Sequence, residues 1–303
     1  MSLLLTLGEV LAVVNAEEPG PPRVGSGFRL TVAGAESNVA VGAARLGADV
    51  AFAGRVGDDE FGRLARTVLR GEGVGVEALV TDPGAPTGLM VKLQRLPGAV
   101  GVRYYRAGSA GSRLSPDDLP DDLLRAASVL HVSGVTPALS ESARAAAFCA
   151  VEAASAAGAL ISFDVNYRSR LWTPDVARPV LSDLASRADI LFVGEDETHV
   201  LTSVPDAPEV LLKRGGRGCA GRFGGTETVR PARRVAAVDP VGAGDAFAAG
   251  YLADRLAGRP PADALDTALA TGAFAVTQPG DWEGLPRRDE LALLDENPET
   301  VQR

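Results

Sequence analysis

The sequence predicts an α/β fold with a mostly parallel central sheet, helices on both faces and a small additional β-layer. Short, continuous apolar runs alternate with longer segments of helical periodicity. Strands buried on both faces read as uninterrupted apolar runs, and their alternation with helices is typical of a parallel sheet with crossover helices. The 303 residues, 46% of them hydrophobic, suit one large unit, so we expect a single domain over residues 1–303.

The expected elements follow from these patterns. Strands are predicted at Leu3–Leu7, Val50–Ala53, Val129–Ser133, Leu160–Phe163, Ile190–Val193, Val210–Leu212 and Val235–Val238. Helices are predicted at Ser37–Leu46, Glu60–Gly71, Glu141–Ala157, Asp175–Arg187, Asp245–Ala257 and Ala262–Val276. No linker, low-complexity segment or internal repeat divides the chain.

Two segments interrupt the alternation of predicted strands and helices. Ala12–Val32 is rich in Pro and Gly, and Thr87–Arg106 reads as a hairpin that turns at Pro97-Gly98. We expect these lid segments, about 12–32 and 87–106, to form a β-layer that projects from the main sheet. Because exposed strand edges need a partner or a cover, we also expect a homo-oligomer assembled through this layer.

Composition excludes several classes of partner. The net charge of −9 disfavours nucleic acid and anionic membranes, and no apolar run is long enough to span a bilayer. The two cysteines have no metal-ligand spacing, so neither a disulfide framework nor a zinc site is expected. The first residues lack a basic region and contain Glu9, which favours a first strand over a signal peptide and a cytoplasmic location.

Two glycines and a carboxylate mark the start of a helix in AVDPVGAGDAFAAGYLA, residues Ala237–Ala253. The first N–H groups of a helix lack intrahelical partners, and the helix dipole adds positive charge there. Gly242 and Gly244 let this backbone approach a ligand closely, which makes an anion hole suited to phosphate. Asp245 could then accept the proton of an attacking hydroxyl. The alternative is an ordinary glycine turn capped by Asp245.

Two long stretches resemble the signatures of the ribokinase-like, PfkB-type carbohydrate kinases. One is DPVGAGDAFAAGYLA, and the other is AGAESNVAVGAARLGADVAFAGRVGDDEFG, residues Ala33–Gly62. The resemblance covers nearly the whole chain and implies an ATP-dependent carbohydrate kinase that uses Mg²⁺. It implies that Asp245 is the catalytic base and that the backbone of Gly242, Ala243 and Gly244 forms the anion hole.

Within that family, three stretches are most similar to kinases of 2-keto-3-deoxygluconate: VRYYRAGSAGSRLSP (102–116), HVSGVTPALS (131–140) and SFDVNYRSRLW (162–172). The resemblance implies that the sugar acid contacts Gly34, Asn38, Tyr104, Arg106, Arg168 and Asp281. A sugar acid needs a fixed positive partner, and guanidinium offers paired donors that fit a carboxylate. An arginine considered alone is usually a solvated surface charge, but these two arginines lie in the matching stretches.

The stretch VLLKRGGRGCAG, which begins at Val210, resembles the nucleotide segment of the family. The resemblance implies that ATP contacts Asn166, Lys213, Gly215, Gly218, Gly242 and Gly244. The family often has an Asn-x-x-Glu motif associated with magnesium at the position of residues 194–197. Glu197 matches the glutamate of that motif, but Gly194 stands at the asparagine position and has no side chain. A strand-end acid is otherwise usually solvated.

Three positions depart from the family pattern. The chain is short between Glu197 and Pro208, and Leu269 stands where many relatives carry an asparagine beside the adenine. Both changes bear on nucleotide affinity and selectivity. Met90 replaces an aromatic residue at the sugar contact of the lid.

The expected function is phosphorylation of 2-keto-3-deoxygluconate to 2-keto-3-deoxy-6-phosphogluconate. Two alternatives remain open from the sequence. One is a kinase for a neutral sugar such as fructose or ribose, which would need no carboxylate partner. The other is a catalytically weak member of the fold that binds a sugar acid as a sensor.

Overall fold

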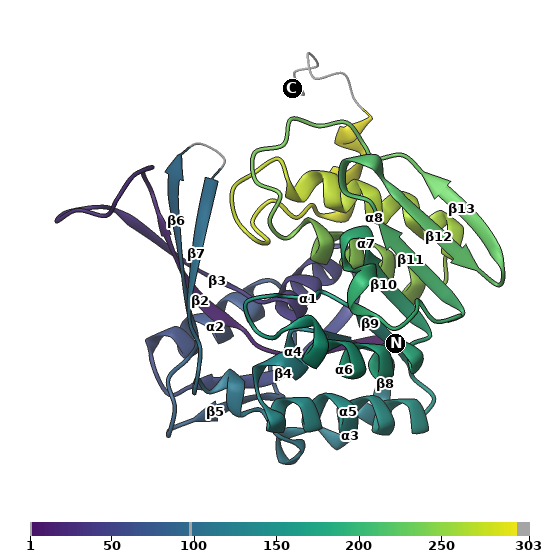
Figure 1. Cartoon of the computed structure of the whole chain (residues 1–303), viewed down its shortest axis with the longest axis horizontal. Helices are drawn as coiled ribbons and strands as arrows, with labels where there is room; N and C mark the ends of the chain where they lie inside the picture. The colour runs from purple at the N-terminus through teal and green to yellow at the C-terminus, as the bar shows by residue number, and fades with distance from the viewer. Residues whose placement is uncertain (1, 97–98, 296–303) are drawn as a thin grey trace.

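A nine-stranded, mostly parallel sheet forms the centre of the molecule (Figure 1). The structure is a computed structural model and describes residues 2–96 and 99–295. Across the sheet, the strands are β13 (Thr226–Arg230), β12 (Cys219–Phe223), β11 (Glu209–Lys213), β10 (Ile190–Gly194), β9 (Leu160–Asp164), β8 (Ala127–Ser133), β1 (Leu3–Leu7), β4 (Asp49–Gly57) and β5 (Leu79–Asp82). Neighbouring strands from β11 to β5 run parallel, while β12 and β13 are antiparallel.

Helices cover both faces of this sheet, as predicted. One face packs against α1 (Ala35–Arg45), α2 (Glu60–Gly71), α7 (Ala243–Leu256) and α8 (Pro261–Ala275). The other packs against α3 (Asp121–Ala126), α4 (Thr136–Leu139), α5 (Glu141–Ala156) and α6 (Pro174–Ser186). Successive strand residues point to opposite faces, so Leu4 belongs to the first core and Leu5 to the second. At the first core, the ring of Phe192 meets Tyr251 edge-on, with centroids 5.7 Å apart.

A separate four-stranded sheet projects from the main body, at the upper left of Figure 1. Its order is β3 (Phe28–Ala33), β2 (Leu11–Ala16), β6 (Leu89–Leu96) and β7 (Ala99–Tyr105), with β2 and β6 parallel. The prediction that two segments form an additional β-layer is therefore confirmed, and we call this four-stranded sheet the lid. The predicted turn at Pro97-Gly98 lies outside the described residues.

The predicted strand at Val235–Val238 is wrong, because these residues form an irregular segment. The N–H of Val238 donates to the carbonyl oxygen of Val276 at 2.7 Å, so it contacts the end of a helix instead of a neighbouring strand. Three strands were not predicted: β5, β12 and β13. β5 and β13 are the edge strands of the sheet, and β12 lies between β13 and β11. These short or polar strands lack the continuous apolar run of a strand that is buried on both faces.

The predicted helices are all present, with bounds that agree within two residues. Helix α2 matches its predicted range, and α7 begins at Ala243, two residues before the expected start. Among the described residues, no helix combines the length and the apolar character needed to cross a membrane.

Candidate active site

The loop that enters α7 adopts a backbone conformation that glycine favours. Gly242 has φ of 78° and precedes the first helical residue. A β-carbon on Gly242 would lie 2.0 Å from the carbonyl oxygen of Asp281, so a side chain cannot be accommodated. The chain therefore turns tightly here, and the N–H groups of the first turn of α7 face the site without intrahelical acceptors.

Asp245 lies in that first turn, with its carboxylate buried between two asparagines. Asn38 of α1 donates its side-chain N–H to Oδ2 at 2.8 Å, and Asn166 donates to Oδ1 at 3.3 Å. Burial raises the pKa of Asp245 to about 7, while the positive charge of Arg168 acts in the opposite direction. A carboxyl group with a pKa near neutrality is suited to accept a proton from a substrate hydroxyl.

A second buried carboxylate, Asp164, lies beside this group and was not predicted from the sequence. It ends β9, and its two oxygens accept hydrogen bonds from Nζ of Lys213 at 2.8 and 2.7 Å. Burial acts to lower the pKa of Lys213, but Asp164 foremost among the nearby acids raises it above the ordinary value. The position of Asp164 at the end of an apolar run, inside SFDVNYRSRLW, is the sequence signal that could have identified it.

Asn166 is positioned by the same carboxylate. It is the one non-glycine residue with positive φ, at 36°, among the described residues, and its backbone N–H donates to Asp164 at 3.2 Å. Such a conformation usually persists only where neighbouring contacts hold it, often at functional sites. Its side chain reaches Asp245, so the structure places it beside the predicted base.

Glu197 lies close to this group, but its carboxylate is engaged by the backbone. One oxygen accepts the N–H of Tyr167 at 2.8 Å, and the other accepts the N–H of Gly194 at 2.7 Å. Burial raises the pKa of Glu197. In the part of the chain that the structure describes, no three acidic, histidine or cysteine side chains form a metal cluster. The carboxylates of Glu197 and Asp164 are oxygen donors of the kind that would hold a magnesium ion.

Two of the residues predicted to bind the sugar acid are already paired with charged side chains. Arg106 forms an ion pair with Glu9, and its guanidinium lies 5.1 Å from the centroid of the Tyr104 ring. Asp281 forms a buried ion pair with Lys92 of β6, a residue that the sequence did not identify. By contrast, Arg168 is exposed and has no carboxylate partner among the described residues.

Gly34 precedes α1 and is packed too tightly for a side chain. Its N–H donates to Oδ1 of Asn38 at 3.4 Å, and a β-carbon there would lie 2.0 Å from the carbonyl oxygen of Glu9. The tight approach at Gly34 and the bond from Asn38 to Asp245 connect the lower end of the lid to the predicted base.

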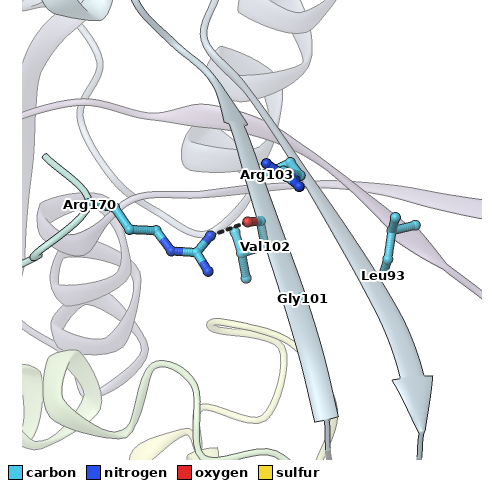
Figure 2. A pocket seen from close by; sticks show the side chains of 5 residues that line it. All are labelled: Leu93, Gly101, Val102, Arg103 and Arg170. Atoms are coloured by element: carbon cyan, nitrogen blue, oxygen red, sulfur yellow. Dashed lines mark hydrogen bonds between the residues drawn. The ribbon is translucent and has the colours of Figure 1, made fainter.

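Several contacts join the lid to the main body near Asp281. Trp282 donates its indole N–H to the carbonyl oxygen of Val32 at 2.7 Å, and Thr31 donates to Glu283 at 2.7 Å. Figure 2 shows a further contact, in which Arg170 reaches from the main body and donates to the carbonyl oxygen of Val102 on β7. This arginine covers part of the free edge of the lid, beside a pocket of about 490 Å³.

A larger cavity of about 920 Å³ opens beside the start of α7. Its polar end is lined by Lys213, Gly215, Gly218 and Gly244, and its apolar part by Val235, Ala237, Phe247, Leu269, Ala273 and Val276. Four of the six residues predicted to contact ATP therefore lie together here, whereas Asn166 and Gly242 do not line the cavity. Leu269 lines the cavity as expected, whereas the short segment between Glu197 and Pro208 does not.

The open first turn of α7, the buried Asp245 carboxylate with its raised pKa and the adjoining cavity are the parts that a phosphotransferase requires. The family model described as pfkB family carbohydrate kinase matches residues 1–288, and the chain belongs to this family. It is an ATP-dependent carbohydrate kinase.

Three relatives illustrate the range of the similarity. The chain is 41% identical to a 2-dehydro-3-deoxygluconokinase of Thermoproteus tenax, over 97% of this chain and 94% of that protein. It is 39% identical to a fructokinase of Klebsiella pneumoniae, over 85% and 90% of the two chains. Its fold matches an E. coli protein, provisionally named ribokinase II and solved with ATP and Mg²⁺, with a TM-score of 0.89, 27% identity and coverage of 97% and 99%.

Asp245→Asn should abolish most turnover while the fold and sugar binding remain. The amide keeps the shape of the carboxylate but cannot accept the proton, and a positioned base typically contributes about 10²–10⁴-fold in rate. Steady-state kinetics and circular dichroism of the purified variant measure the two effects. A kcat close to that of the parent would show that Asp245 is not the base.

The pH dependence should follow the raised pKa of Asp245. Because the base must be ionised, kcat/KM should fall by about tenfold per pH unit below about pH 7. The measurement is kcat/KM from about pH 5.5 to about pH 8.5 at constant ionic strength, with circular dichroism as the control for folding. A profile that stays flat across this range would contradict the assignment.

Proposed function

We propose that this protein phosphorylates 2-keto-3-deoxygluconate on its terminal hydroxyl to give 2-keto-3-deoxy-6-phosphogluconate, with ATP as the donor. The observation that carries the proposal is the placement of Asp245, between two asparagines and close to the charge of Arg168, at the mouth of the anion hole. The similarity to the kinase of Thermoproteus tenax over nearly the whole chain supports the choice of sugar acid.

In the proposed reaction, Asp245 accepts the proton of the terminal hydroxyl while that oxygen forms a bond to the γ-phosphorus. The bond from phosphorus to the bridging oxygen breaks, and ADP leaves. The N–H groups at the start of α7 donate to the transferred phosphoryl group and balance its charge. Lys213 lines the phosphate end of the cavity, where its ammonium can exchange part of its contact with Asp164 for a phosphate oxygen.

Magnesium, when bound together with ATP, neutralises phosphate charge. Glu197 and Asp164 are the residues that would hold it, since their carboxylates lie at neighbouring strand ends. A cytoplasmic location belongs to the same proposal, because ATP is the donor.

Arg168 is proposed as the main partner of the substrate carboxylate. It lies near Asp245 and, unlike Arg106, has no acidic partner in the described part of the chain. A bidentate contact with guanidinium would fix one end of the substrate, so that the far hydroxyl reaches Asp245.

A neutral-sugar kinase is the second candidate. The similarity to the fructokinase of Klebsiella pneumoniae favours it. In addition, the ion pair with Glu9 occupies part of the guanidinium of Arg106, so fewer of its donors remain for an acid.

Arg168→Ala should lower kcat/KM for 2-keto-3-deoxygluconate by at least about tenfold. Arg168 is exposed in the free protein, and the bound acid would cover it; losing one partner of a charge pair that is buried in this way costs roughly 2–5 kcal/mol. Use of fructose or ribose should change little. A coupled ADP-release assay with all three substrates makes the comparison, and Arg125→Ala on the exposed surface of α3 is the matched control. If the parent prefers a neutral sugar, or if acid and neutral sugars decline equally in the variant, the carboxylate contact is not supported.

We also propose that the outer face of the lid joins two subunits. The strand registers place Phe28, Leu30 and Tyr105 on one face, and they are 41%, 48% and 65% exposed. An apolar sheet face of this kind usually has a partner in a soluble protein.

The parent should therefore be a dimer or a higher oligomer by light scattering, and Leu30→Lys should shift it toward the monomer. Val176→Lys, which changes an equally exposed apolar residue on α6, should have no such effect. A monomeric parent, with and without sugar, would remove this part of the proposal.

A further inference from the structure

Glu9 is a buried carboxylate at the point where the chain passes from the main sheet into the lid. It lies between β1 and β2, and only 2% of its surface is exposed. One oxygen accepts a hydrogen bond from the hydroxyl of Ser109 at 3.0 Å, and the other forms the ion pair with Arg106. Neither contact is part of the reaction proposed above.

The lower ends of all four lid strands meet around this residue. Glu9 itself leads into β2, and Arg106 follows β7. Gly34 follows β3, and a β-carbon there would lie 2.0 Å from the carbonyl oxygen of Glu9. Gly88 precedes β6, and its β-carbon would lie 2.8 Å from a carboxylate oxygen of Glu9. Gly88 therefore leaves space for the side chain of Glu9, and Gly34 leaves space for its backbone.

A carboxylate at this position is costly unless a specific partner requires it. Burying an ionised group is unfavourable without pairing, and an apolar side chain of similar size would fill the space without that cost. The ion pair with Arg106 offsets the cost of burying the Glu9 carboxylate. The carboxylate is thus explained by Arg106 and not by packing.

Arg106 retains donor capacity while it is held by Glu9. Its Nε is buried and has no hydrogen-bond partner among the described residues. The guanidinium of Arg106 lies over the ring of Tyr104, so Tyr104 and Glu9 together fix the orientation of its plane. Because guanidinium has five N–H donors, one edge can be fixed by Glu9 while other donors remain for a ligand.

We propose that Glu9 is a positioning residue that couples recognition of the substrate acid to the geometry of the lid, and this inference rests on the proposed function. Glu9 holds the guanidinium of Arg106 in one orientation and joins it to the lower ends of the four lid strands. Binding of the acid by Arg106 is thereby transmitted to the lid as a whole.

The kinetic experiment uses Glu9→Gln, which keeps the size of the side chain but removes its charge. KM for 2-keto-3-deoxygluconate should rise by at least about tenfold, with kcat within about threefold of the parent, while KM for fructose changes by less than about twofold. Glu9→Asp, which keeps the charge with a shorter reach, should give an intermediate KM. If Glu9→Gln does not fold, the KM of Glu9→Asp for the acid tests the proposal in its place. Equal changes for acid and neutral sugar, or a lower KM for the acid, would overturn the proposal.

A double-mutant cycle tests whether Glu9 acts through Arg106. In an Arg106→Met background, Glu9→Gln should change KM for the acid by less than about twofold, because the interaction is already lost. Full additivity of the two effects would contradict the coupling. The matched control is Glu209→Gln, which removes a buried carboxylate paired with Arg255 at 2.8 Å in the main body. It should leave KM for the acid unchanged.

A third measurement needs no substrate. In hydrogen–deuterium exchange of the free protein, Glu9→Gln should speed exchange in all four lid strands but not in β8, β9 or β10, and Glu209→Gln should leave the lid unaffected. Unchanged exchange in the lid would overturn the structural half of the proposal. A parent that prefers fructose would refute the proposed function, and the exchange result would still decide the role of Glu9 in the lid.

Discussion

The burial of the Asp245 carboxylate at the start of α7 is the interaction on which the rest of the site depends. A carboxylate there is unfavourable unless donors surround it, and Asn38 and Asn166 supply them from α1 and from the loop after β9. Since these donors come from distant parts of the chain, the first half of the sheet and the last helices must be docked before the proposed base is in place. Burial is also what raises its pKa toward neutrality.

Charge is organised as matched pairs around this base. Lys213 is paired with Asp164, Lys92 with Asp281 and Arg106 with Glu9. A protein with a net charge of −9 can in this way hold cations near its site without an isolated buried charge. In the proposed reaction, Lys213 exchanges part of its contact with Asp164 for a phosphate oxygen, whereas Arg106 keeps its contact with Glu9.

The lid and the anion hole share one segment of backbone. Asp281 packs its carbonyl oxygen against Gly242 and pairs its carboxylate with Lys92 of the lid, while its neighbour Trp282 bonds to Val32. A displacement of the lid would therefore act directly on the turn at Gly242, which is the proposed phosphate site. This arrangement gives a physical basis for coupling between sugar binding and phosphoryl transfer.

The sequence by itself determined the layered α/β fold, the lid strands and the GAGD turn. These features rest on local periodicity and on glycine conformations, which neighbouring residues specify. Tertiary structure alone decided that Glu9 holds Arg106, because the two residues are far apart in the chain. It also decided that Val235–Val238 lines the cavity and does not form a strand. A strand needs a neighbouring strand as its partner, whereas Val238 contacts the end of a helix. Which distant charges and strands form pairs depends on which segments the fold brings together, and local sequence patterns do not predict these pairs.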